Sequence, residues 1–199
     1  MLPPRGGRAL RGRTAFHLMS AALRTLSTER LTLEPLIPSH AEEMFAGLGD
    51  SQLYAHLDSA PPTSVEALRE RYERLALRTS PDGREQWWNW VLREKTTGEY
   101  VGFVQATVEG RKAQIAYVLF RHRWGEGLAR EAVRRMIAEL TTHGVNSMTA
   151  CVDRANERSQ RLLNSLSFTP RNDPERSLNA SSDEVWSLLA VHNDIEPEG

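Results

Sequence analysis

The most informative segment of the chain is Trp124-Gly125-Glu126-Gly127-Leu128-Ala129. It follows an apolar run at 113–120 with the pattern of a strand, and it precedes an amphipathic run at 128–140 with helical periodicity. A glycine turn between a strand and a helix offers free backbone N–H groups and the positive end of the helix to a phosphate. The familiar nucleotide loops are spaced differently, because Arg130 stands where G-x-G-x-x-G requires glycine and no G-K-[ST] follows. The segment therefore predicts a phosphate-binding turn of another kind.

The composition is that of an ordinary globular protein. The chain has 199 residues, 40% of them hydrophobic and 26% charged, which is enough for one domain with a sizeable core. A formal net charge of -1 provides no global attraction to nucleic acid, and no apolar run approaches the ~20 residues of a membrane span. The one cysteine, Cys151, excludes an internal disulfide and a cysteine metal cluster, and it suits a reducing cytoplasm. We expect no metal, no nucleic acid and no membrane as a partner.

The two ends of the chain differ from its middle. Residues 1–27 are rich in arginine, contain no acidic residue and lack the apolar core of a signal peptide. We expect a disordered basic extension there, with a transit peptide, a nucleic-acid-binding arm or a true start at Met19 as alternatives. One domain is expected over residues 28–192, followed by a loose acidic tail at 193–199.

The periodicities between these ends predict an α/β fold of the mixed α+β kind. Capping patterns at Ser39 and Thr63 each precede a helical stripe, and further helices are expected from Leu128 and Asn156. On the third helix, the expected solvent face carries Arg130, Arg134, Arg135 and Glu139. Strands are predicted at 31–36, 87–92, 100–108, 113–120, 148–152 and 184–191.

Three segments, in the right order, resemble the GCN5-related N-acetyltransferase (GNAT) family. The turn at 124–129 resembles the family's acyl-CoA-binding signature Q/R-x-x-G-x-G/A, with Trp124 in the first place. Residues 152–168 resemble its N-x-x-S/A-x-x-L-Y-x-x-x-G-F motif, beginning at Asn156. The opening at 28–33 and the Trp-Gly-x-Gly-x-Ala form of the turn are similar to the ribosomal-protein N-acetyltransferase (RimJ/RimL-like) branch.

The resemblance implies a mostly antiparallel twisted sheet, flanked by about four helices and splayed between the strands at 113–120 and 147–152 to admit acetyl-CoA. It implies that the pantetheine arm pairs with the backbone of Tyr117, Val118 and Leu119 as an added strand would. The side chain of Asn156 would hydrogen-bond the pantetheine, although an asparagine there could be only a helix cap. The pyrophosphate would be held by Trp124, Gly125, Glu126, Gly127, Leu128 and Ala129, unless this turn is simply tight and binds nothing.

The resemblance implies one catalytic candidate, Ser159, which would donate a proton to the departing thiolate. A serine one turn into a helix is also a routine surface residue. The tyrosine that many relatives use as general acid is Leu163 here, and the position of a general-base glutamate is Cys151, which we interpret as a small hydrophobe. Without an obvious base, an α-amine with pKa ~8 is an easier acceptor than a lysine-like amine near ~10.4. A base could still come from Glu175, Asp183 or Glu184.

Two further clusters bear on the acceptor. Trp88 and Trp90 share one face of a predicted strand and Trp87 the other, so one of them could wall the acceptor pocket and at least one should be core. An acidic group near the first helix could attract a cationic substrate, or could simply be a solvated face. Its members are Glu42, Glu43, Asp50 and Asp58.

The sequence therefore predicts a cytoplasmic N-acetyltransferase that moves an acetyl group from acetyl-CoA directly to an amine. The amine is a protein N-terminus or a small molecule such as an aminoglycoside or polyamine. The alternative is a non-catalytic acyl-CoA-binding module. It is favoured by the replacement of the family's catalytic tyrosine by Leu163 and of its glutamate by Cys151. The resemblance also allows a homodimer.

Overall fold

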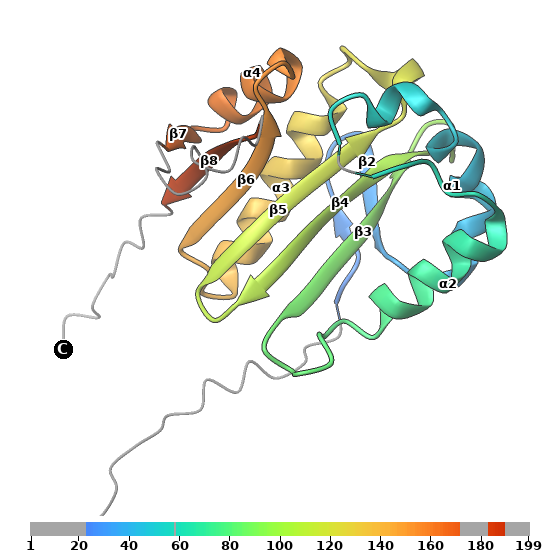
Figure 1. The fold of residues 1–199 in the computed structure, drawn as a ribbon, viewed down its shortest axis with the longest axis horizontal. Helices are drawn as coiled ribbons and strands as arrows, with labels where there is room; N and C mark the ends of the chain where they lie inside the picture. Colours follow the sequence, from blue (N-terminus) through green and yellow to red (C-terminus); the bar gives the residue numbers. More distant parts are fainter. Residues whose placement is uncertain (1–22, 58, 172–182, 190–199) are drawn as a thin grey trace, which may run out of the picture.

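The computed structural model describes residues 23–57, 59–171 and 183–189. Within these residues, eight strands form one sheet in the order β1-β2-β3-β4-β5-β6-β8-β7 (Figure 1). The strands are β1 Leu26–Ser27, β2 Leu31–Pro35, β3 Gln86–Glu94, β4 Tyr100–Glu109, β5 Lys112–Leu119, β6 Ser147–Asp153, β7 Thr169–Arg171 and β8 Asp183–Leu189. The helices are α1 Ala41–Leu48, α2 Val65–Ala76, α3 Leu128–Thr142 and α4 Glu157–Ser165. Short 3-10 turns lie at η1 Pro38–His40, η2 Ser51–Tyr54 and η3 Arg121–Arg123.

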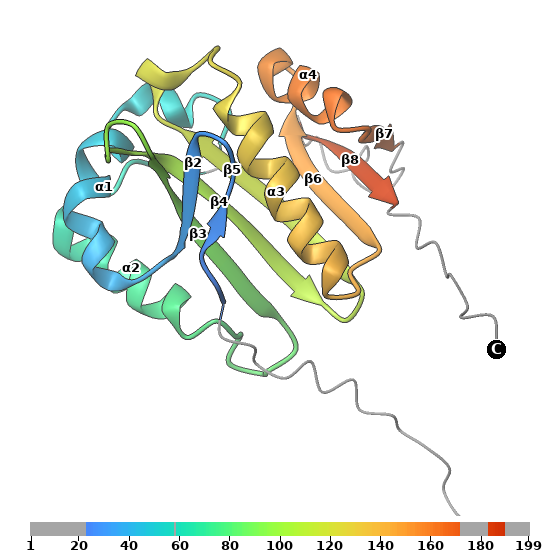
Figure 2. The same cartoon turned by 180° about the vertical axis from the view of Figure 1, so that it is seen from behind.

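The sheet is mixed, as predicted, and mostly antiparallel. Among the described strands, only β5 and β6 run parallel, and the helix α3 connects them; every other neighbouring pair of these strands is antiparallel. A parallel connection needs a crossover of this length, whereas the hairpin from β4 to β5 needs only a two-residue turn. Figure 2 shows α3 crossing the sheet on the face opposite to α1 and α2.

Two apolar cores lie on the two faces of the sheet. On the α3 face, alternate residues of β5 and β6 pack against the buried stripe of α3; these strand residues include Ala113, Ile115, Met148 and Ala150. On the other face, α1 and α2 pack over Val91, Phe103 and Val118. Because successive side chains of a strand point to opposite faces, Tyr117 belongs to the α3 core and its neighbour Val118 to the α1–α2 core.

The first packed residues lie before the predicted domain start. Leu26 is buried, and β1 pairs with β2 through Leu26 and Ser27, so the fold reaches back beyond Thr28. The strands β1 and β7 were not predicted, because two or three residues carry too little periodicity. Most of the predicted basic extension, and all of the acidic tail, lie outside the described residues.

Two predicted helix caps are shifted. Ser64, rather than Thr63, is the N-cap of α2, and its side chain accepts a hydrogen bond from the backbone N–H of Ala67. Ser39 lies inside η1, so α1 begins without a side-chain cap. Asn156 does cap α4, with its side chain accepting from the backbone N–H of Ser159 at 3.1 Å.

Candidate active site

The strands β5 and β6 separate after a short parallel ladder. Their register pairs Lys112–Gln114 with Ser147–Thr149, and within the described residues the ladder goes no further. The rest of β5 keeps its partner β4 but leaves its other edge unpaired up to Leu119. An unpaired edge of this kind can hydrogen-bond an extended ligand as an additional strand would. The predicted splay of the sheet is therefore confirmed.

A cavity of about 390 Å³ lies where the strands separate. This volume is in the usual range for a small-molecule site. One wall is the segment that follows α1, which includes Leu53, His56 and Leu57; the opposite wall is the first turns of α4. The back of the cavity is formed by the end of β5 with Trp124 and Ala129.

The phosphate turn, residues 124–129, has a backbone that requires glycine. Gly125 and Gly127 have φ angles of 87° and 77°, which an L-amino acid with a Cβ adopts only under strain. A Cβ at Gly125 would meet nothing within 4 Å, so backbone conformation rather than space excludes larger residues. Within the described part of the chain, the backbone N–H groups of residues 125–130 donate no hydrogen bond. Together with the positive end of α3, these free donors suit an anion.

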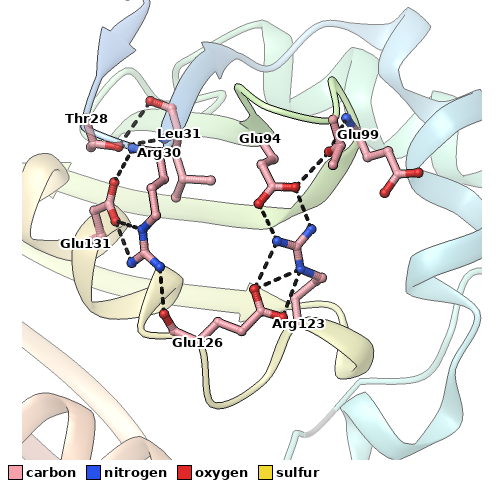
Figure 3. Close-up of polar contacts among 9 residues, drawn as sticks. Thr28, Arg30, Leu31, Glu94, Glu99, Arg123, Glu126 and Glu131 are labelled. Atoms are coloured by element: carbon pink, nitrogen blue, oxygen red, sulfur yellow. Dashed lines mark hydrogen bonds and ion pairs between the residues drawn. The ribbon is translucent and has the colours of Figure 1, made fainter.

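Two arginines hold the phosphate turn from both sides (Figure 3). Arg30, between β1 and β2, donates from Nε to Glu131 at 2.7 Å and from a guanidinium N–H to the backbone oxygen of Glu126 at 2.8 Å. Arg123 pairs with Glu94 at the end of β3 and with the side chain of Glu126. Hydrogen bonding to Arg123 lowers the pKa of Glu94 to about 2. The turn is thus fixed by charge-assisted contacts that leave its amides free.

Trp124 and Arg158 close one end of the cavity. The indole N–H of Trp124 donates to the backbone oxygen of Leu119 at 2.7 Å, so this carbonyl already has one partner. The guanidinium of Arg158 lies over the indole ring, 3.8 Å from its centroid. Arg158 therefore adds a positive charge to the cavity. Arg158 was not predicted as a site residue, because its only signal in the sequence is its position in the first turn after Asn156.

Ser159 has a hydroxyl partner that the sequence analysis also missed. Its Oγ is 2.6 Å from the phenol oxygen of Tyr117, for which only a backbone role was predicted. Burial raises the pKa of Tyr117 to about 12, against the opposing effect of the Ser159 hydrogen bond, so the phenol is protonated at neutral pH. Leu163, which replaces the tyrosine of related motifs, is fully buried in the core. A tyrosine hydroxyl is thus present in this site, but it comes from β5 rather than α4.

The other candidates are distributed as follows. Cys151 is half-buried on the sheet face opposite α3, where its sulfur accepts from the Gln114 amide at 3.6 Å. Glu184 is paired across the ladder with Val152 and so shares the α3 face, away from Cys151. Glu175 and the side chain of Asp183 lie outside the described residues.

The tryptophan and acidic clusters do not form walls of the described cavities. Trp90 is fully buried, Trp88 packs against it edge to face at 6.1 Å, and neither borders the cavity at the splay. In the acidic group, Glu42 pairs with Arg69, and Asp50 accepts from the backbone N–H of Gln52. Asp58 lies outside the described residues.

Two classes of site find no support in the described residues. No group of three histidine, cysteine, aspartate or glutamate side chains there is arranged to hold a metal ion. None of the described helices combines the length and apolar character that a bilayer crossing demands.

The chain resembles known acetyltransferases in sequence and in fold. Residues 30–169 match the family described as acetyltransferase (GNAT) domain. An uncharacterized N-acetyltransferase p20 from Bacillus licheniformis is 32% identical over 150 residues, which cover 73% of this chain and 83% of that protein.

Solved structures share the fold at lower identity. RimL, a ribosomal L7/L12 alpha-N-protein acetyltransferase solved with coenzyme A, has a TM-score of 0.72 at 16% identity, covering 84% of this chain and 98% of its own. A Salmonella typhimurium acetyltransferase, described as modifying the N-terminal serine of ribosomal protein L7/L12, has a TM-score of 0.70 at 15% identity, covering 84% and 100%. A probable acetyltransferase from Chromobacterium violaceum has a TM-score of 0.69 at 20% identity, and the match covers 95% of this chain and 96% of that protein. By the matched domain and the p20 relative, the chain belongs to the GNAT family of acetyltransferases.

Proposed function

We propose that this protein transfers the acetyl group of acetyl-CoA directly to the α-amino group of a peptide or protein N-terminus. One observation carries the proposal: the gap between β5 and β6 opens into a cavity lined by Trp124 and Ala129, the two end residues of the phosphate turn, whose amides at residues 125–129 are free. An extended thiol arm can pair with the β5 edge while its pyrophosphate meets these amides.

The chemistry needs few side chains once the two substrates are aligned. The amine nitrogen attacks the thioester carbon, the tetrahedral intermediate collapses, and the C–S bond breaks. The departing thiolate takes a proton from the Ser159 hydroxyl, which the protonated Tyr117 phenol contacts at 2.6 Å. The acetyl group therefore passes between the substrates without being attached to the enzyme.

A second, smaller cavity supports a small first residue on the acceptor. It has a volume of about 50 Å³ and shares Val118 and Leu57 with the larger one, so the two adjoin on the α1–α2 face. Tyr72 is one of its lining residues, and this residue is only 4% exposed, yet its hydroxyl has no hydrogen-bond partner in the described structure. A buried polar group without a partner is costly, so a substrate hydroxyl or amide there would remove a penalty.

The charges around the cavities disfavour a polycationic acceptor. Arg71 lines the smaller cavity, and Arg158 and Arg161 line the larger one. Among the described residues that line the larger cavity, Glu157 is the one with a carboxylate. No described residue that lines the smaller cavity carries a carboxylate. An aminoglycoside or polyamine would therefore meet more positive than negative charge.

The experiment is thiol release from acetyl-CoA in the presence of matched acceptors. Peptides that begin with serine, alanine or tryptophan, the same peptides with a blocked N-terminus, spermidine and an aminoglycoside are compared at equal concentration. We expect turnover with the free small-residue peptides and none with the blocked ones. Turnover with spermidine alone would overturn the choice of acceptor, and no turnover with any amine would overturn the proposed function.

A further inference from the structure

A histidine that lines the larger cavity lies opposite an aspartate at the end of β6. His56 follows η2, Asp153 is the last residue of β6, and Nδ1 of His56 is 3.8 Å from Oδ2 of Asp153. The side chains keep 37% and 21% of their surface exposed, so both can meet a substrate or solvent. His56 also lines the cavity itself.

The aspartate is held rigidly, with one oxygen directed toward the histidine. Oδ1 of Asp153 accepts the backbone N–H of Ala155 at 2.6 Å, and its backbone oxygen accepts from Asn156 at 2.9 Å. These bonds fix the turn that leads from β6 into α4. Oδ2 is the atom nearest to the imidazole.

This pair lies on the opposite side of the sheet from the hydroxyl pair. Val152 packs in the α3 core, so Asp153, the next residue on the strand, points to the α1–α2 face. Tyr117 belongs to the α3 core and contacts Ser159 there. A thioester held in the gap would therefore have a proton donor on one side and an imidazole on the other.

We propose that His56 is the general base that deprotonates the acceptor amine, and that Asp153 is the residue that positions it. This inference rests on the proposed function. It supplies a general base, which this chain lacks at the position of Cys151. Imidazole is the side chain best suited to exchange protons near neutral pH, and a carboxylate at Nδ1 leaves Nε2 as the base and stabilises the imidazolium. The 3.8 Å separation exceeds a hydrogen bond, and such contacts commonly shorten when the substrates bind.

The proton balance is complete without a further reactant. Neutral His56 takes one proton from the acceptor ammonium, and the free amine forms the C–N bond at the thioester carbon. The C–S bond breaks, the thiolate takes the proton of Ser159, and the excess proton on nitrogen restores that hydroxyl through solvent. His56 then releases its proton, so each turnover yields one amide, one thiol and one proton.

The other charged groups at the cavity set the field in which His56 acts. Arg158 and Arg161 of α4 oppose a second positive charge, whereas Asp153 of β6 and Glu157 of α4 favour it. Asp153 lies 3.8 Å from the ring nitrogen Nδ1. Removing the Asp153 carboxylate should therefore change both the value of kcat/KM and its dependence on pH.

The test compares His56→Gln, Asp153→Asn and the control His143→Gln in the full-length protein. His143 lies past the far end of α3 and borders neither cavity. The measured quantities are kcat/KM for a serine-initiated peptide from about pH 6 to about pH 10, and the affinity for acetyl-CoA by calorimetry.

We expect His56→Gln to lower kcat/KM about 100-fold at neutral pH with unchanged acetyl-CoA affinity. The defect should shrink as the pH approaches the pKa of the acceptor, and also with an alkoxyamine, which is neutral without help. Asp153→Asn should lower kcat/KM less than His56→Gln does, and it should shift the pH dependence of kcat/KM. A wild-type profile for His56→Gln, or a defect that is equal at every pH, would overturn the inference. If the wild-type protein itself transfers acetyl to no amine, it is the proposed function that fails.

Discussion

The back of the cavity and one of its walls are held in place in different ways. The phosphate turn, at the back, is fixed by Arg30 and Arg123, each of which contacts two different partners. The wall formed by residues 51–57 depends on the Asp50 cap, the buried side chain of Leu53 and the Tyr54 hydroxyl bond to Leu48. The phosphate turn is preorganised, whereas residues 51–57 have fewer fixed contacts. Under the proposed function, substitutions in residues 51–57 should change the choice of acceptor more easily than substitutions in the turn.

The largest effect should come from disturbing the backbone of the phosphate turn. Gly127→Val places a β-branched side chain at a φ of 77°, which costs about 1–2 kcal/mol and displaces the free amides. We expect the variant to lose the thermal protection that acetyl-CoA gives the wild-type protein. The matched control is Gly110→Val, because Gly110 also has a positive φ of 58° but lies in the hairpin from β4 to β5. Equal protection of both variants would contradict the anion-binding role of the turn.

A smaller, purely catalytic effect is expected at the hydroxyl pair. Ser159→Ala and Tyr117→Phe should each lower kcat by roughly 100-fold while acetyl-CoA still binds, because a proton donor to the thiolate is lost. The double variant should be little worse than either single one, since the two hydroxyls act as a unit. Ser165→Ala is the control, because Ser165 lies at the exposed end of the same helix. Near wild-type turnover of Ser159→Ala would remove the acid assignment and leave the enzyme intact.

The ion pair behind the phosphate turn predicts a pH-dependent contribution to stability. The pKa of Glu94 falls from 4.5 to about 2 in the folded protein, mainly through its hydrogen bond with Arg123. A carboxyl group whose pKa is lower in the folded than in the unfolded protein stabilises the fold at any pH above its unfolded pKa. For Glu94, this stabilisation is lost as the pH falls from about 4.5 toward about 2. In urea unfolding, Glu94→Gln should be less stable by about 1–3 kcal/mol at neutral pH, with the difference vanishing in acid. A difference that does not change with pH would contradict this account.

The smallest effect is expected on the acceptor wall. Tyr72→Phe removes a buried hydroxyl that has no partner among the described residues, so stability should stay equal or rise by about 1 kcal/mol. Its kcat/KM for a serine-initiated peptide should fall severalfold, while that for an alanine-initiated peptide stays the same. Tyr54→Phe is the contrasting control, because its hydroxyl donates to Leu48 at 3.0 Å and its loss should destabilise the protein. An equal fall with both peptides would argue against a hydroxyl pocket.

The sequence predicted those parts of the site that are local. The phosphate turn, its flanking strand and helix, and the Asn156 cap each depend on residues a few positions apart, so periodicity and turn chemistry suffice. Glu139 shows where this reasoning fails. It was predicted on the solvent face of α3 but is 2% exposed, because Arg24, far earlier in the chain, covers it with an ion pair.

The contacts that sequence could not supply join distant segments. Arg30 meets Glu131 across 101 positions, and His56 meets Asp153 only because the sheet brings the end of β6 beside the segment after η2. Nothing in either local pattern marks these partners. The same holds for Tyr117 and Ser159, which are 42 positions apart and were assigned unrelated roles.

The short ladder between β5 and β6 divides the sheet into five strands and three. Three residue pairs and the packing of α3 are the main ties between the parts, so partial opening at this junction should cost less than global unfolding. Amide hydrogens of β6 and β8 should accordingly exchange as one unit, faster than those of β3 and β4. A cosubstrate that bridges both parts would slow that exchange, making β6 and β8 the most sensitive reporters of occupancy.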